Sequence, residues 1–455
     1  MWFWLNPTLL CVLFGLLGTI PLAFLTPPFQ VPDEGQHFAR AYQISEGQLA
    51  GIVQNSEAGA ILPSAIPELV ERFLGTRAIH ADRPLRNLPW AATSQARAIP
   101  LDPARREFVG FSGAVLYFPL PYLPQAAAIW AGRSAGLGVL DLLYAARLAN
   151  ALVAVLVLAW AVRLLPVGRW ASLLIALFPM ALFEYASASP DALMIAAAFL
   201  FTALALRARA RDWTAGSAAV ALACALIFCP LKVVYAPLLL LSLPASLLPR
   251  VRWGALIGHL VLVGLVVGVT VFWLRFSALA VVTTRAGTDM AAQLAAMRIA
   301  PFRFLAVLLD SFRENGAFVY RSLYGVLGWL KIPFPPPIYW LPAIGLLGCA
   351  IAEVPRPRLS RWWSLWDFGL VLASVVLIET ALYIYWTPVG NSQVDGVQGR
   401  YFFPVLPALA ASVFALIQGN ASARVRLLGR ISVAGVLFGG VLLTYAAVVR
   451  AYAVF

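Results

Sequence analysis

The chain has 455 residues, of which 62% are hydrophobic and only 12% are charged, and its formal net charge is +13. A soluble domain carries about 25% charged residues, so this composition excludes an ordinary soluble protein and indicates an integral membrane protein. Much of the positive charge lies in short arginine-rich segments between apolar runs, which indicates a membrane topology and not nucleic-acid binding.

Apolar runs of roughly 17–25 residues, each long enough to cross a bilayer, recur along most of the chain. They predict an all-α polytopic membrane protein with about 11 transmembrane helices. The predicted spans are 8–26, 141–163, 170–187, 190–207, 214–230, 231–248, 253–275, 337–353, 366–386, 401–418 and 431–449. The first has no basic n-region and no small-residue cleavage site, so we expect a retained anchor.

Short arginine-rich connections set the direction of these spans, because arginine accumulates in cytoplasmic loops. The arginines are Arg163 and Arg169; Arg207, Arg209 and Arg211; Arg250 and Arg252; Arg356, Arg358 and Arg361; Arg424, Arg426 and Arg430. The spans alternate correctly only if the proline-rich segment 113–131 does not cross the bilayer. We expect a membrane-hugging or re-entrant element there, on the outer side.

Two long segments lie outside in this arrangement. Residues 27–140 predict short helices and turns, and residues 276–336 contain an amphipathic stretch from Met290 to Glu314. Segments of this length are uncommon as simple connections and usually carry function. We therefore expect the functional residues in and beside these two loops.

The first loop opens at residues 32–37, Pro-Asp-Glu-Gly-Gln-His, with two adjacent carboxylates and one of only three histidines. Adjacent carboxylates repel each other, so a cation, a metal or a substrate usually holds such a pair. Pro32 suits the start of a helix, and in that helix Asp33, His37 and Arg40 share a face. The alternative is a helix cap with ordinary juxtamembrane charges.

Two further charged residues map to the outer side. Asp191 follows Ser-Pro at a helix start, and Lys232 lies in a tight turn between two apolar spans. An ammonium near the membrane boundary is costly without a role, so Lys232 is a candidate phosphate ligand. Without any function, capping explains Asp191 and snorkelling to the surface explains Lys232.

The segment 396–404, Gly-Val-Gln-Gly-Arg-Tyr-Phe-Phe-Pro, leads into a predicted span. Its glycine amides suit close approach of an anion, and Arg400 can hold a phosphate with two donors. Gln398 and Tyr401 flank this arginine as candidate substrate-binding residues. The alternative is interfacial anchoring, with Tyr401 in the aromatic belt.

Glu379 lies inside the predicted span 366–386, and an intramembrane carboxylate is a functional candidate by default. It favours a transporter, whose charges line a path through the bilayer midplane, unless it pairs with a buried arginine such as Arg147 or Arg275. The sequence has no Walker loop, dinucleotide-binding glycine pattern, His-Glu-x-x-His motif or serine-nucleophile elbow. Nucleotide-driven chemistry inside the cell is therefore not expected.

Four motifs together resemble one family of bacterial membrane proteins. They are Pro-Asp-Glu-x-x-His-Phe-x-Arg-Ala-Tyr-Gln-Ile-Ser-Glu-Gly at 32–47, Ser-Pro-Asp-Ala at 189–192, Leu-Gly-Trp-Leu at 327–330, and Gly-Val-Gln-Gly-Arg-Tyr-Phe-x-Pro at 396–404. Over nearly the whole chain, this succession resembles the family catalogued as domain of unknown function 2142. More distantly, it is similar to GT-C glycosyltransferases, including protein mannosyltransferases and the aminoarabinose transferases of lipid A.

The likeness to GT-C enzymes implies a GT-C-like bundle in three parts. These are a transmembrane module over 1–275 with the extracytoplasmic loop 27–140, a second loop over 276–336, and C-terminal transmembrane helices over 337–455. It also implies inverting transfer of a sugar from a polyprenyl-phosphate donor to a cell-envelope glycan or lipid acceptor. The active site would face outward from the bacterial cytoplasmic membrane.

Individual residues carry over from the same resemblance. Asp33 matches the catalytic aspartate of the first loop and Glu34 its neighbour, Asp191 matches a later acidic position, and Arg147 matches an arginine at the start of the second span. His37 departs from the general GT-C pattern, which puts metal use in doubt.

The chemistry of these residues suits sugar transfer. A sugar hydroxyl is a weak nucleophile, so Asp33 as general base contributes roughly 10²–10⁴-fold, and Lys232, Arg400 and Arg147 suit a leaving phosphate. The expected catalytic residues are Asp33, Glu34 and His37, and the expected substrate- or phosphate-binding residues are Arg40, Arg147, Asp191, Lys232, Gln398, Arg400 and Tyr401.

Glu34, His37 and Asp191 are the candidate ligands for a divalent cation such as Mg or Mn, because hard cations favour carboxylate oxygen. Two other functions remain open at this point. One is a transporter or flippase of lipid-linked glycans, and the other is a non-catalytic factor in envelope polysaccharide assembly.

Overall fold

The computed structural model describes residues 5–79, 90–211, 213–243, 253–280, 287–353, 361–416 and 421–452. Seven helices in this part of the chain are long and apolar enough to cross a membrane, or eight if a bent pair counts as one span. The seven are α1 (Pro7–Leu25), α7 (Val139–Leu164), α10 (Asp191–Arg211), α12 (Trp253–Ser277), α16 (Arg361–Tyr385), η7 (Gly399–Val405) with α17 (Leu406–Leu416), and α18 (Ala423–Tyr452).

The prediction of a helical, multi-pass membrane protein is confirmed. The apolar helix formed by η6 (Pro336–Trp340) and α15 (Leu341–Ala352) has the length of the predicted span 337–353, whereas α11 (Ala215–Phe228) is shorter than the predicted span 214–230. Within the predicted span 231–248, η3 covers Val233–Ser242, and residues 244–248 lie outside the described residues. The predicted span 170–187 is divided into α8 (Arg169–Ala176) and α9 (Pro179–Tyr185). Pro179 begins α9 because proline lacks the N–H needed to continue the preceding helix.

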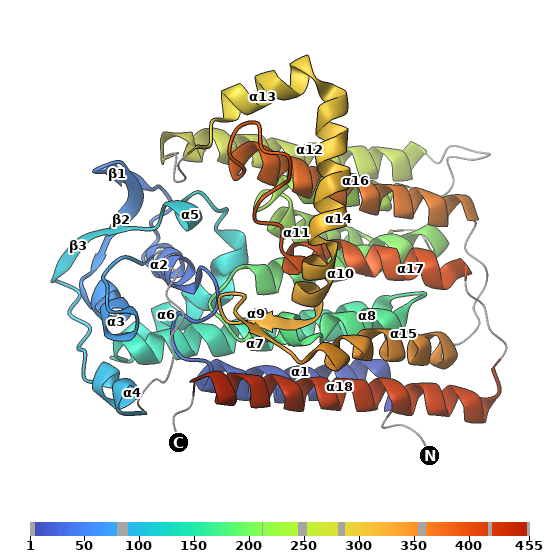
Figure 1. The fold of residues 1–455 in the computed structure, drawn as a ribbon, viewed down its shortest axis with the longest axis horizontal. Coiled ribbons are helices and arrows are strands. Elements are labelled where there is room, and N and C mark those ends of the chain that lie inside the picture. The colour runs from blue at the N-terminus through green and yellow to red at the C-terminus, as the bar shows by residue number, and fades with distance from the viewer. Residues whose placement is uncertain are drawn as a thin grey trace.

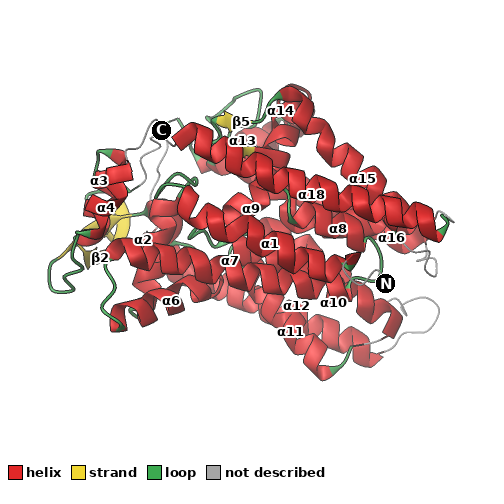
Figure 2. Ribbon diagram, turned by 90° about the horizontal axis from the view of Figure 1, so that it is seen from below, coloured by secondary structure: helices red, strands yellow, loops and turns green. Residues whose placement is uncertain are grey.

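The long helices lie side by side along one direction, with α1 next to α18 (Figures 1 and 2). α18 ends on the side of the molecule where the first loop lies, and it begins at the opposite end of the bundle (Figure 1). At that opposite end, Arg430 packs over the ring of Trp170 at the start of α8. The arginine-rich connections described by the structure therefore gather at one end; Arg250, Arg252, Arg356 and Arg358 lie outside the described residues.

The first loop folds into a small subdomain with a core of its own. Its helices are α2 (Glu34–Ser45), α3 (Ala65–Leu74), α4 (Trp90–Arg97), α5 (Ser112–Val115), η2 (Leu120–Tyr122) and α6 (Leu123–Ser134). An antiparallel sheet in the order β1 (Ile52–Gln54), β2 (Glu57–Pro63) and β3 (Arg106–Gly110) covers one side. Gly59 lies opposite Gly110 in this sheet. The all-α prediction did not include these short strands, which Figure 2 shows at one end of the molecule.

The proline-rich segment 113–131 forms α5, η2 and most of α6, which are short elements of the loop subdomain. The longest of them, α6, has 12 residues, which rise about 18 Å at 1.5 Å per residue. This is much less than a hydrocarbon core of about 30 Å.

The second loop is also largely helical. It contains η5 (Ala278–Ala280), α13 (Met290–Ile299), α14 (Pro301–Gly325) and the two-stranded pair β4 (Val326–Leu327) and β5 (Ile332–Pro333). α13 and α14 are bent by 108° at Pro301, and α14 runs across the direction of the long helices (Figure 1). The predicted amphipathic stretch 290–314 is therefore helical but broken by its proline.

α14 packs directly against the segment that carries Arg400. A Cβ atom at Gly399 would lie 2.1 Å from the Leu323 nitrogen of α14. The Gly399 N–H also donates to the Ser322 hydroxyl over 2.9 Å. Glycine at 399 is therefore a condition for this contact, and it fixes where Arg400 lies.

The positions of the arginines lead to a test of topology. We expect a cysteine in place of Ser56, which is exposed in the loop subdomain, to react with a membrane-impermeant maleimide in intact cells. A cysteine in place of Val425, which is 42% exposed at the arginine-rich end, should react only after permeabilisation. The four native cysteines are buried and give a low background. The opposite labelling pattern would contradict this orientation.

Candidate active site

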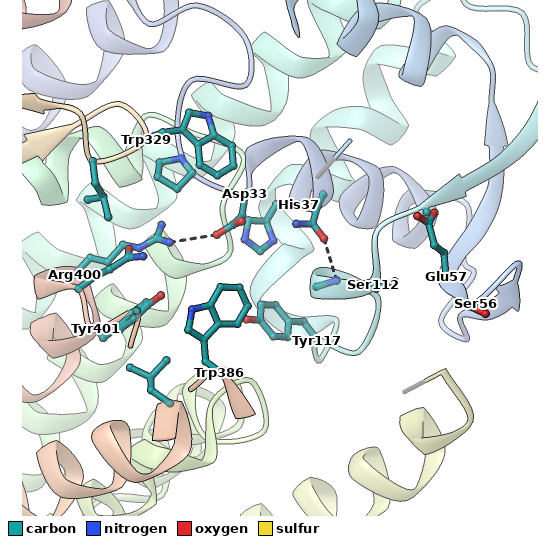
Figure 3. Close-up of a pocket in the computed structure, with 18 residues that line it drawn as sticks. Asp33, His37, Ser56, Glu57, Ser112, Tyr117, Trp329, Trp386, Arg400 and Tyr401 are labelled. Atoms are coloured by element: carbon teal, nitrogen blue, oxygen red, sulfur yellow. Dashed lines mark hydrogen bonds and ion pairs between the residues drawn. The ribbon is translucent and has the colours of Figure 1, made fainter. Parts of the chain in front are cut away.

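A cavity of about 830 Å³ opens between the loop subdomain and the neighbouring ends of the bundle helices. Figure 3 shows its side chains, which come from five separate parts of the chain. They are residues 32–37 at the start of α2, residues 56–57 at the β1–β2 turn, residues 110–117, the turn at 329–330, and residues 382–401. The two loops and three of the four resemblance motifs, at 32–47, 327–330 and 396–404, thus meet at one place.

Asp33 presents a carboxylate to this cavity (Figure 3). It is the residue just before α2 and has a φ of 64° and a ψ of 1°. Aspartate is one of the few residue types other than glycine that adopt this left-handed conformation. The Asp33 side chain is 42% exposed, and its Oδ2 accepts a hydrogen bond from Arg400 over 3.3 Å.

Arg400 lies in the first turn of η7 and is only 5% exposed. Besides Asp33, it donates to Glu184 Oε1 over 2.9 Å, and its guanidinium carbon lies 5.5 Å from the centre of the Tyr401 ring. Glu184, near the end of α9, is fully buried. Arg400 is therefore shared between the buried carboxylate of Glu184 and the exposed carboxylate of Asp33, and neither is its sole partner.

Sequence reasoning gave Glu184 no role, although it is the inner partner of Arg400. The available signal was a carboxylate within the apolar segment 170–187, where an ionisable residue needs a partner. Its partner is distant in sequence, so the pairing itself was not predictable.

Lys232 and Asp191 form a second ion pair. Lys232 Nζ donates to both carboxylate oxygens of Asp191, over 2.8 and 3.0 Å. Lys232 Nζ also lies 5.5 Å from the centre of the Tyr401 ring. Lys232 and Arg400 thus both contact Tyr401, which lines the cavity. Three carboxylates face two cations in this cluster, which leaves one negative charge in excess when all are ionised.

His37 also lines the cavity, one helical turn after Asp33. Its Nδ1 is hydrogen-bonded to the Tyr122 hydroxyl over 2.9 Å, and its ring stacks on that of Tyr117 at 5.9 Å. Burial lowers the pKa of His37 to about 4, although Asp33 and Asp191 act in the opposite direction. His37 is therefore neutral at physiological pH and serves as a hydrogen-bonding group, not as a cation.

Glu34 and Arg147 belong to the framework and do not line the cavity. Arg147, on α7, donates to the two carboxylate oxygens of Glu34 over 2.7 and 2.5 Å, and both side chains are fully buried. Its remaining donors bond carbonyl oxygens at and just beyond the end of α1. Glu34 also accepts from the N–H groups of Phe29 and Ala188. With the five guanidinium donors used and four hydrogen bonds on the carboxylate, neither side chain has a group left for substrate.

Arg40 is also a framework residue, where a phosphate ligand was expected. It is fully buried and donates to Gln43 Oε1 over 2.5 Å, and to the carbonyl oxygens of Leu49 and Tyr117 over 3.0 Å each. These bonds tie α2 to the loop after it and to the segment that follows α5. The shared helix face with Asp33 and His37 does not bring Arg40 into the cavity.

The candidate cation ligands do not fit a metal. Among the described residues, no group of three or more histidine, cysteine, aspartate or glutamate side chains is placed to hold one. Glu34 is saturated by Arg147, and Asp191 is paired with Lys232. His37 alone is left of the three expected ligands.

Gln398 lies in the cavity wall next to Arg400. Its Oε1 is buried and has no hydrogen-bond partner in the part of the chain that the structure describes. A buried amide oxygen without a partner is costly, so a donor on a bound ligand would stabilise it. Across the cavity, Gln36 Oε1 is already used by the Gly113 N–H, over 2.9 Å.

The buried Glu34–Arg147 pair makes a testable contribution to stability. We expect Arg147→Met to lower the free energy of unfolding by about 3–5 kcal/mol, because it leaves a buried carboxylate without its cation. Arg77→Met breaks two exposed ion pairs, with Glu71 and with Glu107, each worth at most about 1 kcal/mol, so it should cost less than Arg147→Met. Thermal unfolding in detergent compares the two variants. Equal losses in both variants would contradict the framework role.

His37 makes stability depend on pH. Between the ordinary histidine pKa of about 6.5 and the folded value of about 4, the unfolded chain binds a proton that the folded chain does not. Stability therefore falls as pH falls through this window. We expect the melting temperature of His37→Gln to drop less than that of the wild type between pH 7.5 and 5. An identical drop would show that His37 does not contribute.

The cavity and its ion pairs extend from Pro32 to Tyr401. No curated protein and no solved structure matches the chain. One family model, described as a predicted membrane protein of the DUF2142 type, matches residues 16–409 and so covers the whole site. The family expected from the four motifs is confirmed: the chain belongs to the DUF2142 family of predicted membrane proteins.

Proposed function

We propose that the protein is a membrane glycosyltransferase of the GT-C type. It transfers a sugar from a polyprenyl-phosphate donor to a cell-envelope glycan or lipid acceptor at the outer face of the bacterial cytoplasmic membrane. The observation that supports this most directly is the Asp33 carboxylate, which faces a large cavity beside a buried arginine. Residues of the loop subdomain line the cavity, and Figure 1 shows this subdomain at the end of the bundle opposite the start of α18 with its arginines.

Asp33 is the general base in this proposal. As the acceptor hydroxyl attacks the anomeric carbon, its proton passes to the Asp33 carboxylate and a new glycosidic bond forms. The bond between the anomeric carbon and the phosphate oxygen breaks, and the polyprenyl phosphate leaves with the electron pair. Attack from the side opposite the leaving group inverts the anomeric configuration. A positioned base of this kind contributes roughly 10²–10⁴-fold.

Arg400 is the best-placed group for the donor phosphate. Its guanidinium lies within 3.3 Å of the proposed base, and Glu184 holds it from behind. A fixed cation where negative charge develops on the leaving oxygen stabilises the transition state without reorganisation. The Asp191–Lys232 pair adds a second cation next to Tyr401. Lys232 is already paired, so it tunes the local charge and Arg400 makes the direct contact.

The apolar part of the donor also has a route. Leu330 and Leu382 line the cavity beside the charged residues. α14, which crosses the bundle nearby, exposes a row of large apolar side chains: Phe302, Leu305, Leu309 and Phe312. In this proposal the polyprenyl tail leaves the cavity past Leu330 and Leu382 and lies along the exposed apolar side chains of α14.

A transporter or flippase of lipid-linked glycans is the second candidate, and Glu379 favours it. This carboxylate on α16 is 2% exposed, and its Oε2 has no hydrogen-bond partner among the described residues. A transport path needs charged or polar groups along its length. Glu379 does not line the cavity, whose charged residues lie beside the loop subdomain, and the buried Arg209–Asp367 pair belongs to the arginine-rich end. Sugar transfer therefore has more support.

Substitution of the base separates these functions. We expect Asp33→Asn to lower the release of polyprenyl phosphate from defined polyprenyl-phosphate sugars by 10²-fold or more, because the amide cannot accept the proton. The purified full chain is assayed with Asp102→Asn as a matched control, since Asp102 is exposed in the loop subdomain. Equal turnover by Asp33→Asn and wild type would remove Asp33 as base. Full function of Asp33→Asn in cells would favour the non-catalytic assembly factor.

A further inference from the structure

Aromatic side chains form much of the cavity wall. Tyr117, Trp329, Trp386 and Tyr401 all line it, and Figure 3 shows the two tryptophans on opposite sides of the Asp33–Arg400 ion pair. An indole ring gives a broad, rigid apolar face with a single polar N–H. A sugar ring has the matching shape, because its C–H bonds form apolar faces and its hydroxyls lie around the rim.

Trp329 is held in place by an unusual stretch of backbone. Its Nε1 donates to the Phe29 carbonyl oxygen over 3.1 Å. The next residue, Leu330, has a φ of 56°, and Phe29 has a φ of 66°. Positive φ values in bulky apolar residues are strained, and they persist where the surrounding structure enforces them, often at ligand sites. The strain on both sides of this hydrogen bond fixes one tryptophan against the cavity.

Trp386 is held by a packing contact with a glycine. Its ring lies against Gly396, where a Cβ atom would come within 2.5 Å of Trp386 Cδ1. Gly396 has a φ of 79°, so both the conformation and the ring contact require glycine. A tryptophan that only anchors the helix would face the lipid interface, whereas Trp386 faces the cavity and is 45% exposed.

The cavity continues past Asp33 and His37 to the β1–β2 turn (Figure 3). Glu57 lies at this far end, with its carboxylate over Gly110, where a Cβ atom would be 2.1 Å from Glu57 Oε2. The turn before it has positive φ at Asn55 and Ser56, which sets the direction of β2. Within the described residues, Glu57 forms no ion pair, so its oxygens are open to hydroxyl hydrogens of a ligand.

The size of the cavity matters for the ligand. Sites that enclose drug-sized molecules measure roughly 300–1,000 Å³, and this one is near the upper end, at about 830 Å³. Figure 3 shows Glu57 apart from Asp33 and Arg400, on the other side of His37 and Ser112, so a donor sugar held at Asp33 and Arg400 leaves this end of the cavity open. The far end therefore has room and polar groups for further sugar rings.

We propose that the acceptor is a saccharide of two or more units, bound with sugar faces on Trp329 and Trp386 and its distal hydroxyls at Glu57. This inference rests on the proposed glycosyl transfer and selects a glycan over a simple lipid as its acceptor. The hydroxyl to be modified lies near Asp33, and the rest of the chain extends toward the β1–β2 turn.

Calorimetric binding to the purified full chain tests this directly. The probes are size-fractionated oligosaccharides released by mild acid from the envelope of the producing cells, and the monosaccharides from their complete hydrolysis. We expect at least tenfold tighter binding of the oligosaccharides. Trp386→Ala should weaken that binding at least tenfold, Trp386→Phe less, and Glu57→Gln several-fold. Matched controls are Trp130→Ala, on the 62% exposed tryptophan of α6, and Glu314→Gln on α14.

Three outcomes overturn the acceptor assignment: no oligosaccharide binds the wild type, monosaccharides bind equally well, or Trp386→Ala binds as the wild type does. Melting temperatures exclude misfolding of the variants, and Trp386→Phe keeps an aromatic ring in the same place. A separate assay of polyprenyl-phosphate release tests the chemistry. Saccharide binding that depends on Trp386, without any release of polyprenyl phosphate, would support the glycan site and contradict the glycosyltransferase. Release of polyprenyl phosphate without saccharide binding would support the glycosyltransferase and contradict the glycan site.

Discussion

The buried pair of Glu34 and Arg147 is the interaction on which the outer end of the molecule depends. It joins the end of α1, the start of α2, the body of α7 and the turn before α10 in one set of hydrogen bonds. Moving two charges out of water is costly, and good geometry with all polar atoms paired offsets that cost. Because Glu34 is fixed, its neighbour Asp33 is fixed as well, with its carboxylate toward the cavity.

Charge is used in two different ways around this centre. The Glu34–Arg147 pair is fully buried and all its hydrogen-bonding groups are used, so it stabilises the structure and does not bind a ligand. The outer group of Asp33, Arg400 and Glu184 is less complete, because one arginine serves two carboxylates and one oxygen of Glu184 has no partner among the described residues. Incomplete pairing in a buried site is unfavourable for stability and useful for binding a charged substrate.

Much of the fold was predictable because two of its determinants are visible in short stretches of sequence. These are the length of each apolar run, which must match the bilayer, and the positions of the arginines between the runs. The apolar runs gave the long helices, and the prolines of segment 113–131 correctly indicated that it is not one long helix. The strands of the loop subdomain were missed because they are short and depend on distant pairing. At the site, the motifs located Asp33 and Arg400, whereas burial decided that Glu34, Arg147 and Arg40 hold the framework. Periodicity places residues on a helix face and does not say which face meets a cavity.

The close contact at Gly399 has a mechanical consequence. α14 lies across the outside of the bundle with apolar side chains exposed, and its backbone touches the residue next to Arg400 with no space for even one methyl group. A sideways displacement of α14 therefore also displaces the Arg400 guanidinium. Any displacement of α14 is transmitted in this way, through Gly399, to Arg400 and its two carboxylates.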